Sequence, residues 1–250
     1  MSKFEWLTES SRRFLAAGYL SEGETPEQRI QAIADHAEKI LGIEGYSNKF
    51  YDYMSRGWYS LASPVWGNFS KKRGLPVSCF GSRPSDSVGS ILYTQAEVGM
   101  MSKMGGGTSG FFGDIRARGS DIADNGKTSG AAHFAELFDN VTNVISQGSM
   151  RRGKMAAYLN IDHGDIEEFL NIGTDGNTIQ NLLHAVTVPD YWMKEMIAGD
   201  SDKRRIWAKV LKVRSEIGYP YVLYTGNVNK NKPDVYKDKE MDIVASNLCS

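Results

Sequence analysis

The residues of this chain with the most distinctive chemistry are its two cysteines, Cys79 and Cys249. Cys249 stands one residue from the end of the 250-residue sequence, a poor position for core packing or for a structural disulfide. The sequence has no Cys-x-x-Cys pair and no histidine cluster near either cysteine, which disfavours a disulfide scaffold and a zinc site. Reduced, reactive thiols are therefore one interpretation, and two small buried hydrophobic residues are the other.

The composition excludes several classes of function. The chain has 29 basic and 30 acidic residues, so its net charge of −1 provides no overall field for a nucleic acid or an anionic membrane. No apolar run reaches the ~18 residues of a membrane-spanning helix, and the first residues lack the layout of a signal peptide. We expect a cytoplasmic globular protein that recognises its partners through local sites.

Two glycine-containing stretches invite comparison with phosphate-binding loops. Gly126-Lys127-Thr128 ends like a P-loop, but Asp121 stands where that motif requires its first glycine. Residues 105–110 follow a helix-like segment instead of a strand and lack the dinucleotide-binding spacing. This second stretch is either a flexible turn or a place where bare backbone amides meet ribose or phosphate oxygens.

The elements that must position these residues form a helical part and a mixed part. In the first part, Thr25-Pro26-Glu27-Gln28 supplies an N-cap, a first-turn proline and a capping-box glutamine. From about residue 85, helices alternate with short apolar strands, which favours an α/β core. The pattern predicts helices at 87–104, 131–147 and 165–170, strands at 155–160, 185–188 and 221–224, a helix capped by Asp190 that ends near Gly199, another around 206–211, and a polar surface excursion at 227–239.

Five segments carry a family resemblance through their order and spacing. They are Ser60-Leu61-Ala62-Ser63-Pro64, Leu75-Pro76-Val77-Ser78-Cys79-Phe80, residues 105–120, Ser146-Gln147-Gly148 with Arg151-Arg152-Gly153, and Ser246-Asn247-Leu248-Cys249. The series resembles the catalytic (alpha) subunit of aerobic, class I or II type ribonucleotide reductases, which make deoxynucleotides from ribonucleotides. The resemblance implies an α/β fold: a helical lead-in at residues 1–70, then, at 71–250, the first half of a ten-stranded α/β barrel that ends within the finger loop.

The resemblance also implies roles for individual residues. Cys249 matches the cysteine that becomes a thiyl radical and abstracts the 3′ hydrogen of the substrate ribose. Cys79 matches one of two cysteines that supply reducing equivalents and finish as a disulfide, and Asn247 matches an amide that bonds the 2′ region. The expected substrate-binding residues are Ser63, Ser78 and Gly106, and the alternative for the two serines is an ordinary structural role in a turn.

A second implied site binds a deoxynucleoside triphosphate or ATP effector. Asp86 and Ser87 match contacts with the effector sugar, and Arg116 matches a phosphate contact that suits a guanidinium fork. Residues 173–181, with Gln180, match a loop that relays effector identity to the substrate base, although a solvated turn is the alternative there. Many relatives use an ATP-binding cone domain as an overall switch. We expect none here, and therefore no dATP inhibition through a cone.

The implied partners are numerous. A radical-generating small subunit with a metal cofactor, or alternatively adenosylcobalamin, would start the reaction, while this chain itself would bind no metal. Thioredoxin or glutaredoxin would reduce the disulfide, and the completed subunit would be a homodimer. The family places a catalytic glutamate one position past Ser250. We expect a second polypeptide to complete the barrel, as in a naturally split enzyme; an interrupting inserted element and an incomplete gene are the alternatives. The alternative is a non-catalytic effector-binding or scaffold protein.

Overall fold

The computed structural model describes residues 3–148 and 152–247, which divide into two compact units. The N-terminal unit contains residues 3–78 with Gln147 and Gly148, and the second contains the rest of the described chain. Within these residues, no helix combines the length and the apolar character needed to cross a bilayer.

The N-terminal unit is built from four helices, α1 (Glu9–Ala16), α2 (Pro26–Leu41), α3 (Tyr46–Ser55) and α4 (Ser63–Asn68). The predicted capping box starts α2, since Thr25 Oγ1 accepts from Gln28 N at 3.2 Å and Gln28 Oε1 accepts from Thr25 N at 2.9 Å. Arg29 is buried, and its Nε donates to Trp66 O at 2.7 Å. This bond ties α2 to the end of α4, where carbonyl groups lack helical partners.

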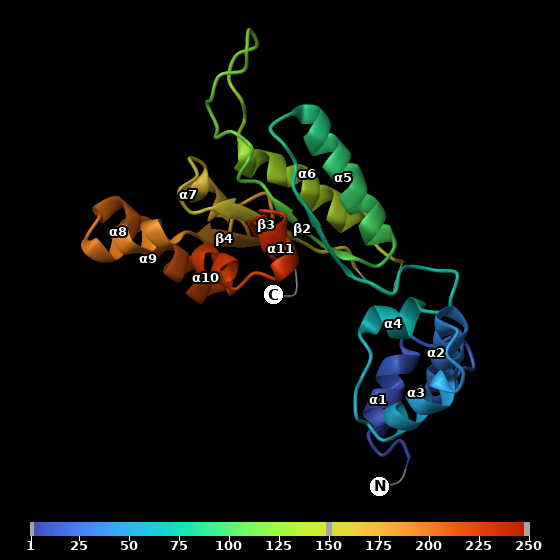
Figure 1. The fold of residues 1–250 in the computed structure, drawn as a ribbon. Helices are drawn as coiled ribbons and strands as arrows, with labels where there is room; N and C mark the ends of the chain where they lie inside the picture. The colour runs from blue at the N-terminus through green and yellow to red at the C-terminus, as the bar shows by residue number, and fades with distance from the viewer. Residues whose placement is uncertain (1–2, 149–151, 248–250) are drawn as a thin grey trace. The chain divides into compact units, whose positions relative to one another are not determined.

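The second unit is a parallel sheet with helical crossovers (Figure 1). The strands are β1 (Cys79–Ser82), β2 (Gly107–Phe111), β3 (Met155–Asn160), β4 (Leu183–Val188) and β5 (Tyr221–Tyr224), paired in that order. The helices are α5 (Val88–Lys103), α6 (Ala131–Val144), α7 (Ile166–Phe169), α8 (Asp190–Ala198), α9 (Ser201–Ile217), α10 (Thr225–Lys230) and α11 (Asp234–Asp238). The expectation of a helical part followed by an α/β part is thus confirmed.

The two faces of the sheet are covered differently. On one face, side chains such as Leu159 and Val186 join the main core with residues of α5, α6, α8 and α9. On the other face, Phe111 and Tyr158 belong to a smaller cluster against which Val244 and Ala245 pack. We call this second side the inner face; it is covered by the segment 241–247 that follows the short helices α10 and α11.

The flexible turn, one of the two alternatives for residues 105–110, is wrong from Gly107 onwards. Residues Gly107–Phe111 form β2, and all five are buried between β1 and β3. Glycine, threonine and serine have weak or mixed strand preferences, so pairing on both sides overrides the local signal. Gly110 also has a packing reason, because a Cβ there would lie 2.5 Å from Met155 Cε.

Other elements differ from their predictions in extent. Helix α6 ends at Val144, three residues early, because Ile145 adopts an extended backbone conformation. Strand β4 begins at Leu183, since Leu183 and His184 pair with β3. Asp190 is the first residue of α8 and follows an N-cap at Pro189, so the expected side-chain cap is wrong. The predicted excursion at 227–239 includes most of α10 and all of α11.

Candidate active site

Cys79 begins β1 and is exposed. In the parallel ladder it pairs with Gly107, and Gly81 pairs with Ser109. Side chains alternate along a strand, so Cys79 lies on the same face as Gly81, and paired residues of neighbouring strands share that face. Ser109 in turn pairs with Ala156 of the inner-face cluster. The Cys79 thiol is therefore presented on the inner face of the sheet.

The segment carrying Asn247 lies over the same face. A cavity of about 420 Å³ is lined by Gly81, Ser82, Ser109 and Phe111 of the sheet and by residues 241–247, Asn247 included. Tyr158, in β3, donates from Oη to Asn247 O at 3.2 Å. The structure thus brings the predicted residues Cys79 and Asn247 to one face, while Cys249 lies outside the described residues.

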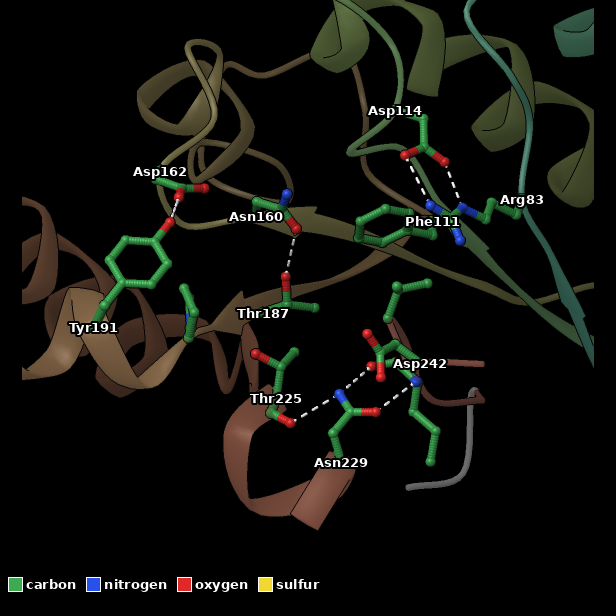
Figure 2. Close-up of a pocket in the computed structure, with 13 residues that line it drawn as sticks. Arg83, Phe111, Asp114, Asn160, Asp162, Thr187, Tyr191, Thr225, Asn229 and Asp242 are labelled. Atoms are coloured by element: carbon green, nitrogen blue, oxygen red, sulfur yellow. Dashed lines mark hydrogen bonds and ion pairs between the residues drawn. The ribbon is translucent and has the colours of Figure 1, made fainter. Parts of the chain in front are cut away.

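A second cavity, of about 330 Å³, opens at the carboxyl ends of the strands (Figure 2). Its polar groups are engaged with one another: Arg83 pairs with Asp114, and Thr187 Oγ1 donates to Asn160 Oδ1 at 2.8 Å. Tyr191 donates its hydroxyl to Asp162, a hydrogen bond that raises the pKa of Tyr191 to about 12. These pairs hold the strand ends and the start of α8 together at the rim of the inner face.

The predicted substrate-binding residues are divided between the units. Ser63 starts α4, and Ser78 directly precedes Cys79; both are partly buried residues of the N-terminal unit. Gly106 is a buried residue of the second unit, where a Cβ would lie 2.5 Å from a ring carbon of Phe80. Its amide donates to Met101 O at 2.8 Å, so the expectation of a bare amide is wrong at this position. Substrate contact by these residues stays a prediction.

Three of the four predicted effector residues lie together. Asp86 accepts from Arg116 twice, from its backbone N at 3.2 Å and from its Nε at 2.6 Å. Arg116 also donates from Nη1 to Asp121 O at 2.6 Å. Ser87 is the N-cap of α5 and accepts from Ser90 N at 3.2 Å. The result is a half-exposed cluster with a cationic group beside the start of a sixteen-residue helix.

Gln180 lies elsewhere. Its Nε2 donates to Thr174 O at 2.9 Å and to Asn177 O at 2.7 Å, so the side chain closes the turn to which it belongs. This turn precedes β4, whereas Arg116 follows β2. Since the strands are parallel, the two residues lie at opposite ends of the sheet.

Sequence reasoning missed two residues that contact the segment 241–247. Tyr158 was part of a predicted buried strand, and Asn229 was part of the predicted surface excursion. The Asn229 side chain exchanges two hydrogen bonds with the backbone of Ile243. No local pattern marks either residue, because each partner lies 14 or more residues away in the sequence.

Comparisons with known proteins match both parts of the fold. A family model described as the all-alpha domain of ribonucleotide reductase matches residues 5–74, and one described as its barrel domain matches residues 77–203 and 198–250. The solved class Id ribonucleotide reductase alpha subunit of Actinobacillus ureae is 55% identical, with a TM-score of 0.94, over 100% of this chain and 46% of its own.

Two curated relatives extend the comparison. The ribonucleoside-diphosphate reductase large subunit of Invertebrate iridescent virus 6 is 29% identical over 99% of this chain and 27% of its own length. The vitamin B12-dependent ribonucleoside-diphosphate reductase of Thermoplasma acidophilum is 27% identical over 87% of this chain and 31% of its own length. The chain thus spans about a third of these relatives. It belongs to the ribonucleotide reductase large-subunit family, with the all-alpha domain and five parallel strands of the barrel domain.

Proposed function

We propose that this chain is the N-terminal part of a catalytic subunit that reduces ribonucleotides to deoxyribonucleotides by radical chemistry. The observation that carries the proposal is the shared location of Cys79 and Asn247 on the inner face of a parallel sheet. A redox thiol and a polar amide on one face of a sheet suit a substrate that must be both held and reduced. Family membership supplies the reaction class.

In the proposed reaction, a thiyl radical at Cys249 takes the 3′ hydrogen atom of the ribose, leaving a carbon radical and an S–H bond. The 2′ hydroxyl then leaves as water after protonation. Cys79 and a second cysteine from outside these 250 residues give up two electrons and two protons and form a disulfide. Return of the hydrogen atom to the 3′ carbon regenerates the Cys249 radical, and Asn247 orients the 2′ region throughout.

We propose that the radical comes from a partner or a cofactor. Among residues 3–148 and 152–247, no group of three or more His, Cys, Asp or Glu side chains is placed to hold a metal ion, so we assign no metal step to them. We propose a metal-containing small subunit as the source, because the 55% identical relative is a class I alpha subunit. Adenosylcobalamin is the alternative, and omitting each in turn from an assay decides between them.

The test of function is reconstitution. The polypeptides that purify with the 27.7 kDa chain are identified by intact mass spectrometry, which also tests the prediction of a second polypeptide that completes the barrel. The assembly is then assayed for deoxynucleotide formation with the radical source and thioredoxin or glutaredoxin. Cys249→Ser should abolish formation without changing assembly, whereas activity that survives this change would exclude the proposal.

A second candidate function is non-catalytic effector binding, which the Asp86–Arg116 cluster favours. Under both functions, Arg116→Ala should weaken deoxynucleoside triphosphate binding, because it removes the guanidinium that is bonded to Asp86, next to the N-cap of α5. Lys127→Ala, which removes an exposed cation paired with Asp121, is the matched control. Binding without any deoxynucleotide formation by the complete assembly would favour the second function.

We also propose a homodimer of the completed subunit. Helix α5 exposes Val88, Leu92, Tyr93 and Met100, an apolar set unusual for a solvated helix surface. Leu92→Glu should shift the assembly towards the monomer in sedimentation velocity. Glu97→Gln, a change on the same helix outside this apolar set, should leave the distribution unchanged, and a monomeric wild-type assembly would refute the dimer.

A further inference from the structure

The segment 241–247 is held on the inner face although it forms no regular helix or strand. Asn229, in α10, binds this segment at Ile243. Ile243 N donates to Asn229 Oδ1 at 2.8 Å, and Asn229 Nδ2 donates to Ile243 O at 3.0 Å (Figure 2). One carboxamide thus satisfies both backbone groups of a single residue, as a neighbouring strand would. Asn229 Nδ2 also donates to Thr225 O at 3.0 Å, which fixes the carboxamide against its own helix.

A second anchor lies four residues further along. The hydroxyl of Tyr158 donates to Asn247 O at 3.2 Å. Tyr158 is 1% exposed, so its ring is immobilised by packing and its hydroxyl is a fixed reference point on β3. Between the anchors, Val244 and Ala245 pack against the inner-face cluster. The segment is therefore held by hydrogen bonds at Ile243 and Asn247 and by the apolar contacts of Val244 and Ala245, which lie between these two residues in the sequence.

This arrangement specifies register. Apolar contact through Val244 and Ala245 alone discriminates weakly between neighbouring registers, because hydrophobic packing is not directional. The Asn229 carboxamide bonds both the N–H and the C=O of Ile243, and the Tyr158 hydroxyl bonds the carbonyl of Asn247. These directional bonds are all satisfied in only one alignment of the segment.

We propose that Asn229 and Tyr158 are positioning residues that set the register of the segment 241–247 and so place Asn247 on the inner face, the face that also presents Cys79. They act on the substrate through Asn247 and not by contact. The inference rests on the proposed function for its catalytic consequence, while the anchoring itself is independent of that function.

Hydrogen–deuterium exchange on the 250-residue chain tests the anchoring. Asn229→Ala should speed exchange of the Ile243 amide about tenfold, because this change removes its acceptor. Asn229→Asp keeps an oxygen for that amide but sets an anion against Ile243 O, so its effect should be intermediate. Asn231→Ala is the matched control, since Asn231 Nδ2 donates to Asn227 O within its own turn. Wild-type exchange at Ile243 in Asn229→Ala would overturn the inference.

Turnover by the complete assembly tests the consequence. Tyr158→Phe and Asn229→Ala should each lower kcat about tenfold, while KM for the ribonucleotide and the affinity for the effector change less than about twofold. Asn229→Asp should recover part of kcat, and Asn231→Ala should be unaffected. An unchanged kcat in both test variants refutes the positioning role. If the wild-type assembly makes no deoxynucleotide, the proposed function fails, and the exchange experiment still decides whether the anchors hold.

Discussion

His184 should make the second unit less stable in mild acid. The residue is 1% exposed and is the second residue of β4. Its ring centroid lies 5.6 Å from that of Phe169 and 6.2 Å from that of Tyr219. Its Nε2 has no hydrogen-bond partner among the described residues. Burial lowers the pKa of His184 from 6.5 to about 4, because the charged ring would lose its hydration without gaining a partner.

Proton linkage gives the sign and the size of the change that His184 makes to the free energy of unfolding. Above the unfolded value of 6.5, His184 is neutral in both states and exerts no effect. As the pH falls from 6.5 towards 4, the unfolded chain binds a proton that the folded chain excludes, so the free energy of unfolding decreases. The loss should be about 2 kcal/mol at about pH 5, and its limit below the folded pKa is about 3 kcal/mol.

Urea unfolding at about pH 7.5 and about pH 5 measures this loss in the wild type and in His184→Leu, which removes the titrating group at similar volume. Carboxylates such as Glu27 and Glu168 change the free energy of unfolding little between about pH 7.5 and about pH 5. Hydrogen bonds from arginines lower their pKa values, so the stability that they add is lost only as the pH falls below the unfolded value of 4.5. The wild type should lose about 2 kcal/mol more than the variant. A difference below about 0.5 kcal/mol would refute a neutral, buried His184.

Three further substitutions test the packing of the fold by denaturant unfolding. Arg29→Met should destabilise the N-terminal unit by about 3 kcal/mol, because the Trp66 carbonyl and the Ser70 hydroxyl lose the hydrogen bonds that Arg29 donates to them. A loss near zero would contradict this prediction. Asp139→Ala should cost about 2 kcal/mol, since Asp139 Oδ1 accepts from Asn181 N and Leu182 N, both at 2.7 Å, and Asp139→Asn should recover part of it. Gly130→Ala should lower the free energy of unfolding by about 2 kcal/mol more than Gly119→Ala. Both glycines have positive φ, but only a methyl group at Gly130 would lie 2.5 Å from Arg118 N. Equal losses would show that the structure relieves this clash.

Local signals decided which elements the sequence could predict. Helix α2 was predictable because its capping box lies within four consecutive residues, Thr25 to Gln28. Strand β3 was predictable because Met155–Asn160 is a short, mostly apolar run, as a strand buried on both faces requires. Strand β2 gave no such signal, because its stability comes from pairing with β1 and β3, segments far away in the sequence.

The same division holds for the site. Cys79 and Asn247 could be proposed from the family resemblance that their neighbouring motifs carry. The register of the sheet accounts for the face of Cys79, and the bond from Tyr158 accounts for that of Asn247. Tyr158 and Asn229 could not be proposed, since a tyrosine in an apolar strand and an asparagine in a polar stretch are each ordinary in their local context. Their roles exist only once the segment 241–247 returns across the sheet.

The small residues that give β2 a weak strand signal are also the ones that leave space at the candidate site. Side chains alternate along β2, so Gly107, Ser109 and Phe111 face inwards, and the first two are small. Together with Gly81, Ser109 lines the cavity of about 420 Å³ that Asn247 also lines. Branched residues at these positions would raise strand propensity and fill the space beside Cys79. A weak local strand signal is therefore the expected consequence of keeping room on the inner face, where we propose that the substrate binds.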